Sequence, residues 1–239
     1  MATGKEYGTE FRSLFYSPAS MVFCGIDFSG LELRVLGHYL SIYDNGNFSK
    51  ILLEDDIHST NQKLLGLSSR SQAKTFIYAY VYGGGNQRVS EILKVDISEA
   101  KRIRERFEQK LPALKLLKDA VISKHRRLGY VKGLDGRKLI GRAEFSLLNL
   151  LIQSAGALLV KQGTIILNND LEKEGYKFGR DYAMVLHVHD EMQFIVKEEL
   201  IEPFKVIAEG LFKKTQDHFN FRCQLDGEIK VGQNWSDTH

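Results

Sequence analysis

The sequence predicts an α+β fold in which a sheet subdomain is interrupted by a mostly helical subdomain. Apolar runs typical of buried strands lie near the start of the chain, at 22–26, and near its end, at 182–196 and around Ile229. The stretch between them, about 57–128, reads as mostly helical, and the chain shows no internal repeat or flexible linker. Because strands lie at both ends, we expect them to meet in one sheet with the helices inserted.

The first strand ends abruptly at Asp27, and a helix is expected to follow it directly. Ser29 and Glu32 have the S-x-x-E spacing of a capping box, which marks the start of that helix. Residues 44–47, Asp-Asn-Gly-Asn, are typical of a turn. A later helix begins after Ser68–Ser69, and the three glycines at 83–85 end it.

Further helices are expected near 98–109 and 112–127, where Lys and Arg are frequent, and over 145–173. Asp135-Gly136 is a hairpin turn signal. The apolar run 182–196 is interrupted at His189-Asp190-Glu191, so it reads as two strands with acidic residues at their bend. One more helix is expected near 203–219.

Composition is that of an ordinary globular chain. Of 239 residues, 43% are hydrophobic and 26% charged, which excludes a fibrous, collagen-like or wholly disordered protein. The net charge of +3 permits a nucleic-acid partner without requiring one. Cys24 and Cys223 form neither a disulfide framework nor a zinc motif, so we expect a cytoplasmic location. The most apolar stretch, 147–160, contains polar residues and predicts a buried helix and no membrane span, and Trp235 is interpreted as a packing residue.

Two carboxylates are placed by rigid elements, Asp27 at the end of a strand and Asp190 at the bend of a hairpin. If these strands are neighbours, the two carboxylates can share divalent metal ions, and hard oxygen ligands suit magnesium. The alternative is that each aspartate merely ends its strand in solvent.

Arg70, Lys74, Tyr78 and Tyr82 recur every four residues, so they form one slowly drifting helix face with two cations followed by two rings. Cations suit a triphosphate, and rings suit a base or a sugar. The alternative is a solvated basic start and a buried aromatic end.

A polar pair and a basic segment are candidates for DNA contact. Asn149 and Gln153, four residues apart on an apolar helix, suit either a core hydrogen-bond network or a DNA minor groove. Between positions 124 and 142 the only acid is Asp135, among eight basic residues that could follow a phosphate backbone or form a solvated face. The basic residues are Lys124, His125, Arg126, Arg127, Lys132, Arg137, Lys138 and Arg142.

Taken together, these segments resemble family A (Pol I-like) DNA polymerases, most closely the replicative enzymes of T-seven-like phages. Residues 27–34 (DFSGLELR) look like motif A, 70–83 (R-x3-K-x3-Y-x3-YG) like motif B, and 189–191 (HDE) like motif C. Residues 132–138 (KGLDGRK) and 149–156 also match segments of this family, in the expected order.

The resemblance implies a two-metal nucleotidyl transfer. Asp27, Asp190 and the Phe28 carbonyl would hold two Mg²⁺ ions, and Glu191 would be an auxiliary acid near the primer end. Lys74 would be a candidate acid for the leaving pyrophosphate. The catalytic residues it implies are Asp27, Asp190, Glu191 and Lys74.

The resemblance also implies the nucleotide and DNA contacts. Glu32 would close the sugar pocket against a 2′-hydroxyl, Tyr78 would lie against the sugar, and Tyr82 would stack at the insertion site. The nucleotide-binding set is Glu32, His58, Arg70, Lys74, Tyr78 and Tyr82. The DNA-binding set is Arg137, Asn149, Gln153 and His189.

In domain terms, the resemblance implies a palm with an antiparallel sheet, formed by the two segments 1–39 and 149–239, and fingers over 40–148. We expect no thumb and no 3′–5′ exonuclease in this chain. The expected partners are primer–template DNA, deoxynucleoside triphosphates and a separate chain that carries the N-terminal polymerase fragment. Neither a membrane nor thioredoxin is expected to bind.

The expected function is template-directed DNA synthesis by the C-terminal portion of a split or truncated phage polymerase, in the cytoplasm of the infected cell. A non-catalytic DNA-binding or assembly subunit is the alternative. A single-subunit RNA polymerase is disfavoured by Glu32 and by the 78–83 segment, and a metal nuclease would have no use for motif B.

Overall fold

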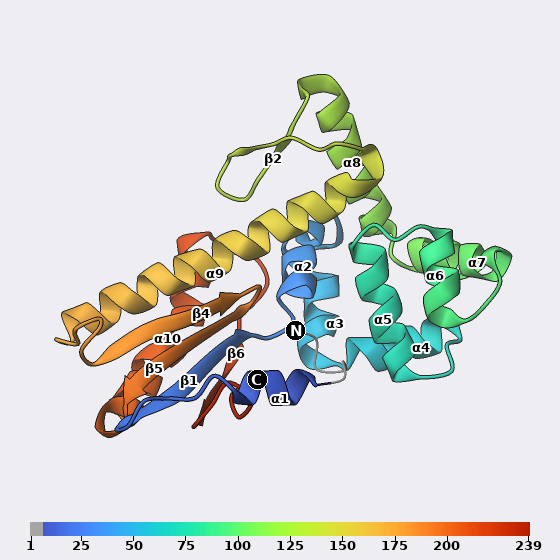
Figure 1. Ribbon diagram of the computed structural model, residues 1–239. Coiled ribbons are helices and arrows are strands. Elements are labelled where there is room, and N and C mark those ends of the chain that lie inside the picture. The colour runs from blue at the N-terminus through green and yellow to red at the C-terminus, as the bar shows by residue number, and fades with distance from the viewer. Residues whose placement is uncertain (1–6) are drawn as a thin grey trace. The chain divides into compact units, whose positions relative to one another are not determined.

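The computed structural model describes residues 7–239 (Figure 1). The first six residues of the expected palm segment, 1–39, therefore lie outside the described residues. Contacts between Cα atoms divide the chain into two units. Unit 1 contains Met1–Leu31, Gly156–Phe221 and Leu225–His239, and unit 2 contains Glu32–Ala155 and Arg222–Gln224.

The divisions between the units differ from the expected palm and fingers boundaries. We placed those boundaries after 39 and after 148, whereas the contacts divide the chain after Leu31 and after Ala155. The first division falls at the start of α2 (Leu31–Asp44), directly after the turn at Ser29–Gly30, and the second falls inside the continuous helix α9 (Leu147–Lys173). The names palm for unit 1 and fingers for unit 2 stay a prediction.

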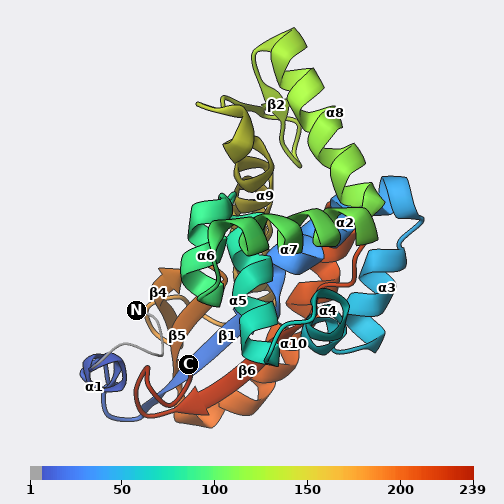
Figure 2. The same cartoon turned by 90° about the vertical axis from the view of Figure 1, so that its right-hand side faces the viewer.

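Unit 1 is built on a four-stranded antiparallel sheet in the order β4-β5-β1-β6 (Figures 1 and 2). Its strands are β1 (Met21–Phe28), β4 (Tyr182–Val188), β5 (Glu191–Lys197) and β6 (Gly227–Gly232). β1 pairs with both β5 and β6. The expectation that strands from both ends of the sequence share one sheet is therefore confirmed.

Two helices pack on one face of this sheet, the second half of α9 (Leu147–Lys173) and α10 (Ile201–His218). Phe28 packs edge-on against Phe212 of α10, with ring centroids 5.0 Å apart. Gly163 of α9 lets the helix approach closely, because a Cβ there would lie 3.1 Å from the Phe28 ring. Side chains of a strand alternate between faces, so Phe28 and Met192 point toward the helices while their neighbours Asp27 and Glu191 point away.

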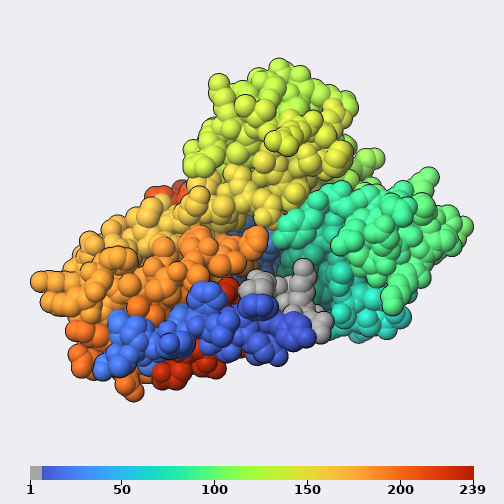
Figure 3. Space-filling model, viewed as in Figure 1, coloured from blue at the N-terminus to red at the C-terminus, as the bar shows by residue number. Residues whose placement is uncertain are grey.

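The opposite face of the sheet carries the end of the chain and α1 (Gly8–Ser13). Gln193 accepts a hydrogen bond from the Thr238 hydroxyl at 2.7 Å. Trp235 is buried, stacks edge-on with Phe15 and lies under the Arg12 guanidinium. Figure 3 shows the segment around α1, in blue, beside the surface of β4 and β5.

Unit 2 is mostly helical, and α4 to α7 pack as neighbours around α5 (Figure 2). Its core includes Phe76, Phe107 and Leu114. The elements are α2 (Leu31–Asp44), α3 (Asn47–Glu54), α4 (Ile57–Leu65), α5 (Arg70–Val81), α6 (Asn86–Leu93), α7 (Ile97–Lys110), α8 (Pro112–Leu128), β2 (Val131–Lys132), β3 (Lys138–Leu139), η1 (Glu144–Ser146) and the start of α9.

A three-residue segment near the end of the chain, Arg222–Gln224, also belongs to unit 2. The Arg222 backbone N–H donates to His38 Nδ1 at 3.0 Å, and the Arg34 guanidinium donates to the Gln224 carbonyl. The buried Cys223 sulfur lies 3.4 Å from where a Cβ on Gly37 would be. This segment therefore lines α2, although the chain before and after it belongs to the sheet unit.

The long helix α9 is the one span among the described residues with the length and composition to cross a membrane. Of its most apolar window, 44% is buried inside the protein. Leu151, Ile152, Leu159 and Val160 are buried, which is the arrangement of a core helix. The expectation of a buried helix agrees with this packing.

Candidate active site

The two predicted metal carboxylates belong to neighbouring strands of unit 1. Asp27 lies near the end of β1 and is paired in register with Glu191 of β5. The Phe28 backbone N–H donates to the Asp190 carbonyl oxygen at 3.0 Å. His189 makes the tight bend before Asp190 in the left-handed region, at φ 54°. The sheet therefore brings Asp27 and Asp190 together on neighbouring strands, as a shared metal site requires, and their role as metal ligands stays a prediction.

The electrostatics of this cluster favour a cation. Burial, followed by repulsion from Asp190, Glu191 and Glu228, raises the pKa of Asp27 to about 7 against the opposing charge of Lys230. A concentration of negative charge of this kind favours a divalent ion, and carboxylate and carbonyl oxygens are its preferred ligands. Asp27, Asp190 and the Phe28 carbonyl therefore fit the implied ions in donor type, although no preformed group of three or more His, Cys, Asp or Glu ligands exists among residues 7–239.

Glu191, the expected auxiliary acid, is buried and held by three side chains. Its Oε1 accepts hydrogen bonds from Trp235 Nε1 and Gln193 Nε2, both at 2.5 Å. Its Oε2 lies 2.6 Å from His239 Nδ1. Trp235 is therefore more than the packing residue we expected, because a buried indole N–H needs an acceptor.

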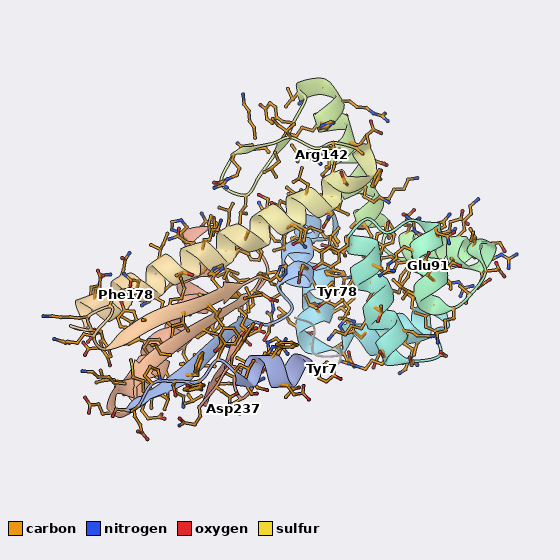
Figure 4. All side chains as sticks on the ribbon, in the orientation of Figure 1. Tyr7, Tyr78, Glu91, Arg142, Phe178 and Asp237 are labelled. Carbon is orange, nitrogen blue, oxygen red and sulfur yellow. The ribbon has the colours of Figure 1, made fainter. Side chains whose placement is uncertain are left out.

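The predicted face of two cations followed by two rings lies in unit 2, on α5 and its C-cap residue Tyr82. Ser69 caps this helix by accepting from the Gln72 N–H at 3.2 Å. Ala73, Phe76 and Ile77 are buried on the other side of the helix. Arg70, Lys74 and Tyr82 are exposed, and Tyr78, in the last third of α5 (Figure 4), is half-buried.

The cationic end of this face includes His58 and also an acid that we did not predict. The Arg70 Nε donates to Asp56 Oδ2 at 2.5 Å. Asp56 also caps α4, by accepting from the His58 N–H at 3.1 Å. Burial lowers the pKa of His58, as do the charges of Arg70 and Lys74. The three predicted triphosphate contacts therefore share one electrostatic environment, with Asp56 holding one of them.

The ring end of the face connects to Glu32. The Tyr82 hydroxyl donates to Glu32 Oε1 at 2.7 Å. Burial and this acceptor raise the pKa of Tyr82 to about 12. The nearby Gln153 opposes that shift, although its Nε2 makes no hydrogen bond of normal geometry among the described residues. Asn149 Oδ1 is likewise buried without a partner there, so the core-network alternative for this pair gains no hydrogen bond from these two atoms.

The basic segment 124–142 is less free of acids than its sequence indicates. Arg126 makes a two-pronged ion pair with Glu144, at 2.5 and 2.7 Å, and Arg137 pairs with Asp135 across the hairpin turn. Lys138 lies 5.0 Å over the Tyr130 ring. Exposed ion pairs of this kind are weak, so the cations stay available to exchange their partners for phosphates.

Comparison with known proteins gives the relationship. The profile of DNA polymerase family A matches residues 2–237. The DNA-directed DNA polymerase of Enterobacteria phage T3 is 36% identical over 234 residues, covering 90% of this chain and 33% of that protein, and that of Escherichia phage T7 is 37% identical with the same coverage. The chain thus spans about a third of the length of these relatives.

A solved structure shares the fold. The polymerase domain of Pol1 from M. smegmatis, in complex with DNA primer–template and dNTP, superimposes with a TM-score of 0.86 at 20% identity. The match covers 99% of this chain and 44% of that one. The mixed architecture with an antiparallel sheet is therefore that of a family A polymerase domain, and this chain belongs to DNA polymerase family A.

Proposed function

We propose that this chain carries out template-directed addition of deoxynucleotides to the 3′-hydroxyl of a DNA primer. The observation that carries the proposal is the nearness of Asp27 and Asp190, which follows from the register pair Asp27–Glu191 and the adjacent Phe28–Asp190 backbone hydrogen bond, in a cluster whose negative charge favours a cation. The family and the phage relatives named as DNA polymerases support the reaction class.

Polymerases of this family use divalent metal, and Asp27, Asp190 and the Phe28 carbonyl would hold it here. Two such ions, when bound, activate the 3′-hydroxyl and offset charge on the leaving pyrophosphate. The primer oxygen bonds to the α-phosphorus and gives its proton to solvent water, while the bond from the α-phosphorus to the bridging oxygen breaks and pyrophosphate leaves with that oxygen. Glu191 lies next to Asp190 and would act near the primer end, and His189 would contact DNA.

The face of α5 would hold the incoming nucleotide. Arg70, Lys74 and His58 would bind its triphosphate, and Lys74 would donate a proton to the leaving pyrophosphate. For Arg70 this means exchanging Asp56 for a phosphate oxygen. The carboxylate of Asp56 and the triphosphate would compete for the same Arg70 guanidinium. The affinity for the nucleotide should therefore depend on Asp56.

Selection of deoxynucleotides would rest on Glu32 and Tyr82. Their 2.7 Å hydrogen bond closes one wall of a sugar site, with Tyr78 on the same helix face. A 2′-hydroxyl there would have to displace a hydrogen-bonded carboxylate, which is costly. Arg137, Asn149 and Gln153 would contact the primer–template.

We further propose that another polypeptide, carrying thumb and exonuclease functions, works with this chain in the cytoplasm of a phage-infected cell. The support is the length of the relatives, of which this chain matches about a third. A partner of this kind would supply duplex-holding surface, because most nonspecific affinity for DNA comes from backbone contacts.

The test is primer extension by the full chain with Mg²⁺ and the four deoxynucleotides. Asp27→Asn and Asp190→Asn should abolish extension, while the matched control Asp119→Asn, at an exposed position of α8, should not change it. Extension that survives both site variants contradicts the proposal. Duplex binding with no extension, alone and with an N-terminal polymerase fragment added, favours a non-catalytic DNA-binding subunit.

A further inference from the structure

One polar side chain lies on the buried side of α5, the helix that carries the predicted nucleotide-binding face. The buried residues of this helix are Ala73, Phe76, Ile77, Tyr80 and Val81. Tyr80 is the only one of them with a polar side chain, and it is 4% exposed. Because successive residues of a helix are turned by about 100°, Tyr80 points away from both Tyr78 and Tyr82, which lie two positions before and after it.

The Tyr80 hydroxyl connects α5 to two other helices of unit 2. It donates to Glu108 Oε1 of α7 at 2.5 Å, and Lys118 Nζ of α8 donates to the same hydroxyl at 3.0 Å. Lys118 Nζ also donates to Glu108 Oε1 at 2.9 Å, which closes a triangle of hydrogen bonds. Each of the three groups therefore holds the other two, and the hydroxyl is the point at which α5 joins them.

The Tyr80 ring is surrounded by side chains from the same two helices. Phe107 packs edge-on against it with ring centroids 5.1 Å apart, and Lys118 Nζ lies 5.1 Å from its centroid. The Arg104 guanidinium lies 5.5 Å from the centroid and donates to Asn86 Oδ1 of α6 at 2.7 Å. Both the ring and the hydroxyl of Tyr80 are therefore fixed by groups of α7 and α8.

These groups keep the protonation states that their hydrogen bonds need at neutral pH. Burial, followed by the acceptor Glu108, raises the pKa of the Tyr80 hydroxyl above its usual range, so the hydroxyl stays a donor. Burial alone would raise the pKa of Glu108, but the donors Tyr80 and Lys118 outweigh it and lower the pKa of this carboxyl. The bond from Tyr80 to Glu108 is therefore charge-assisted, which makes it stronger than a bond between neutral groups.

This hydrogen bond fixes the rotation of α5 about its axis. The other buried side chains of the helix are apolar, and apolar contact is non-directional, whereas a hydrogen bond weakens steeply when its angle changes. A rotation of α5 that breaks the bond from Tyr80 to Glu108 also moves Tyr78 and Tyr82 on the opposite side of the helix. Tyr82 then loses the alignment of its 2.7 Å hydrogen bond to Glu32.

We propose that Tyr80 is a positioning residue that anchors the rotation of α5 through Glu108 and Lys118, and so sets how Tyr78 and Tyr82 meet the sugar of the incoming nucleotide. This step rests on the proposed function, to which the nucleotide contacts belong. Tyr80 is buried on the other side of the helix, so it acts without touching the nucleotide. A misplacement of about 1 Å at a distant anchor is enough to reduce activity strongly.

The experiment measures single-nucleotide insertion by the full chain with Tyr80→Phe, which keeps the ring and removes the hydroxyl. We expect the KM for deoxynucleotides to rise by about tenfold, the effect of one hydrogen bond to a charged group, while kcat changes by less than about twofold. The preference for deoxynucleotides over ribonucleotides should fall as well, because Tyr82 and Glu32 lose their alignment. Glu108→Ala removes the same bond from α7 and should give the same result, and the double variant should lose no more than either single variant.

The matched control is Tyr39→Phe, because the Tyr39 hydroxyl is also buried in unit 2 but makes no hydrogen bond among the described residues. This control should keep the KM, the kcat and the sugar preference of wild type. The inference is overturned if Tyr80→Phe keeps the wild-type KM, if its loss appears in kcat alone, or if Tyr39→Phe shows the same loss.

A second measurement separates this inference from the proposed function. Hydrogen exchange of backbone amides, followed by mass spectrometry, reports local opening of the last turn of α5 without DNA or nucleotide. Exchange there should be about tenfold faster in Tyr80→Phe than in wild type and unchanged in Tyr39→Phe. Absence of primer extension by wild type overturns the proposed function, whereas unchanged exchange in Tyr80→Phe overturns the anchoring of α5.

Discussion

His239 Nδ1 lies 2.6 Å from Glu191 Oε2, so a residue at the end of the sequence contacts a motif C carboxylate 48 positions earlier. Trp235 Nε1 and Gln193 Nε2 occupy the other oxygen of the same group. Glu191 is therefore a buried carboxylate whose charge is held by the tail of the chain. A carboxylate in this position loses much of its solvation and depends on these donors.

Removing one donor should destabilise the protein measurably. Trp235→Phe keeps the packing with Phe15 but leaves Glu191 Oε1 one hydrogen bond short, and it should lower the free energy of unfolding by about 2 kcal/mol. Urea denaturation measures the loss. Combining Trp235→Phe with Glu191→Gln should cost less than the sum of the single changes, and strict additivity would show that the two residues are not coupled.

Asp27→Asn should make the chain more stable at neutral pH while it abolishes synthesis. Asp27 has its pKa raised to about 7 in the folded protein, so the fold binds more protons than the unfolded chain between about pH 4 and 7. Stability from this group is therefore lost as the pH rises through that window. The neutral amide should add roughly 2 kcal/mol at pH 8 without metal. Denaturation of both proteins at pH 5 and pH 8 checks this, and an equal difference at both pH values contradicts it.

Asp56→Asn should tighten binding of the incoming nucleotide. Asparagine can still cap α4, but it no longer holds the Arg70 guanidinium as an ion pair, so Arg70 meets the triphosphate without competition. We expect the KM for deoxynucleotides to fall by roughly two- to fivefold. Steady-state extension kinetics measure it. Arg70→Ala should raise KM in both backgrounds, and an Asp56 effect that persists in Arg70→Ala would place its cause elsewhere.

The buried His38 should make the free energy of unfolding decrease at acid pH. Burial lowers the pKa of His38 to about 4, so the unfolded chain binds more protons between about pH 6.5 and 4. The contribution of His38 to the free energy of unfolding is fully present above pH 6.5. It decreases by up to roughly 3 kcal/mol as the pH falls to 4. His38→Asn keeps an acceptor near the Arg222 N–H and removes the titration. Its stability should depend less on pH in that window than that of wild type, as urea denaturation at several pH values would show.

Tyr82→Phe should weaken selection against ribonucleotides. The change removes the hydroxyl that orients Glu32 and keeps the ring. We expect the ratio of deoxynucleotide to ribonucleotide incorporation to fall by about tenfold, the value of one hydrogen bond to a charged group. Single-nucleotide insertion measures the ratio. An equal loss with both sugars would assign Tyr82 to stacking alone.

Local pattern predicts much of this structure. The strand before Asp27, the hairpin bend at His189–Glu191 and the four-residue spacing from Arg70 to Tyr82 are each visible in a short window of sequence, and the structure has all three. The separate helices α3 and α6 were not resolved from the sequence, because their short apolar patterns merge with those of their neighbours.

Contacts between distant segments could not be predicted in this way. The pair Arg70–Asp56 joins a cap residue of one helix to the start of the next. Glu191 meets Trp235 and His239 because β6, which pairs with β1, precedes the tail of the chain. No hydrophobic period and no fixed spacing in the sequence marks either of these contacts. The one sequence feature that indicates such a contact is Trp235, because a buried indole N–H needs a hydrogen-bond acceptor.

The arrangement of Arg222–Gln224 has a consequence for how the chain reaches its fold during translation. Unit 2 includes these three residues beside α2. In unit 1, β1 cannot pair until β5 and β6 have been synthesised, some 160 to 200 positions later. Neither unit is complete until nearly the whole chain has left the ribosome. Long-range pairing of this kind folds slowly and leaves β1 exposed in the meantime. Chaperone demand in the producing cell should therefore fall mainly on the nascent chain between the synthesis of β1 and that of β6.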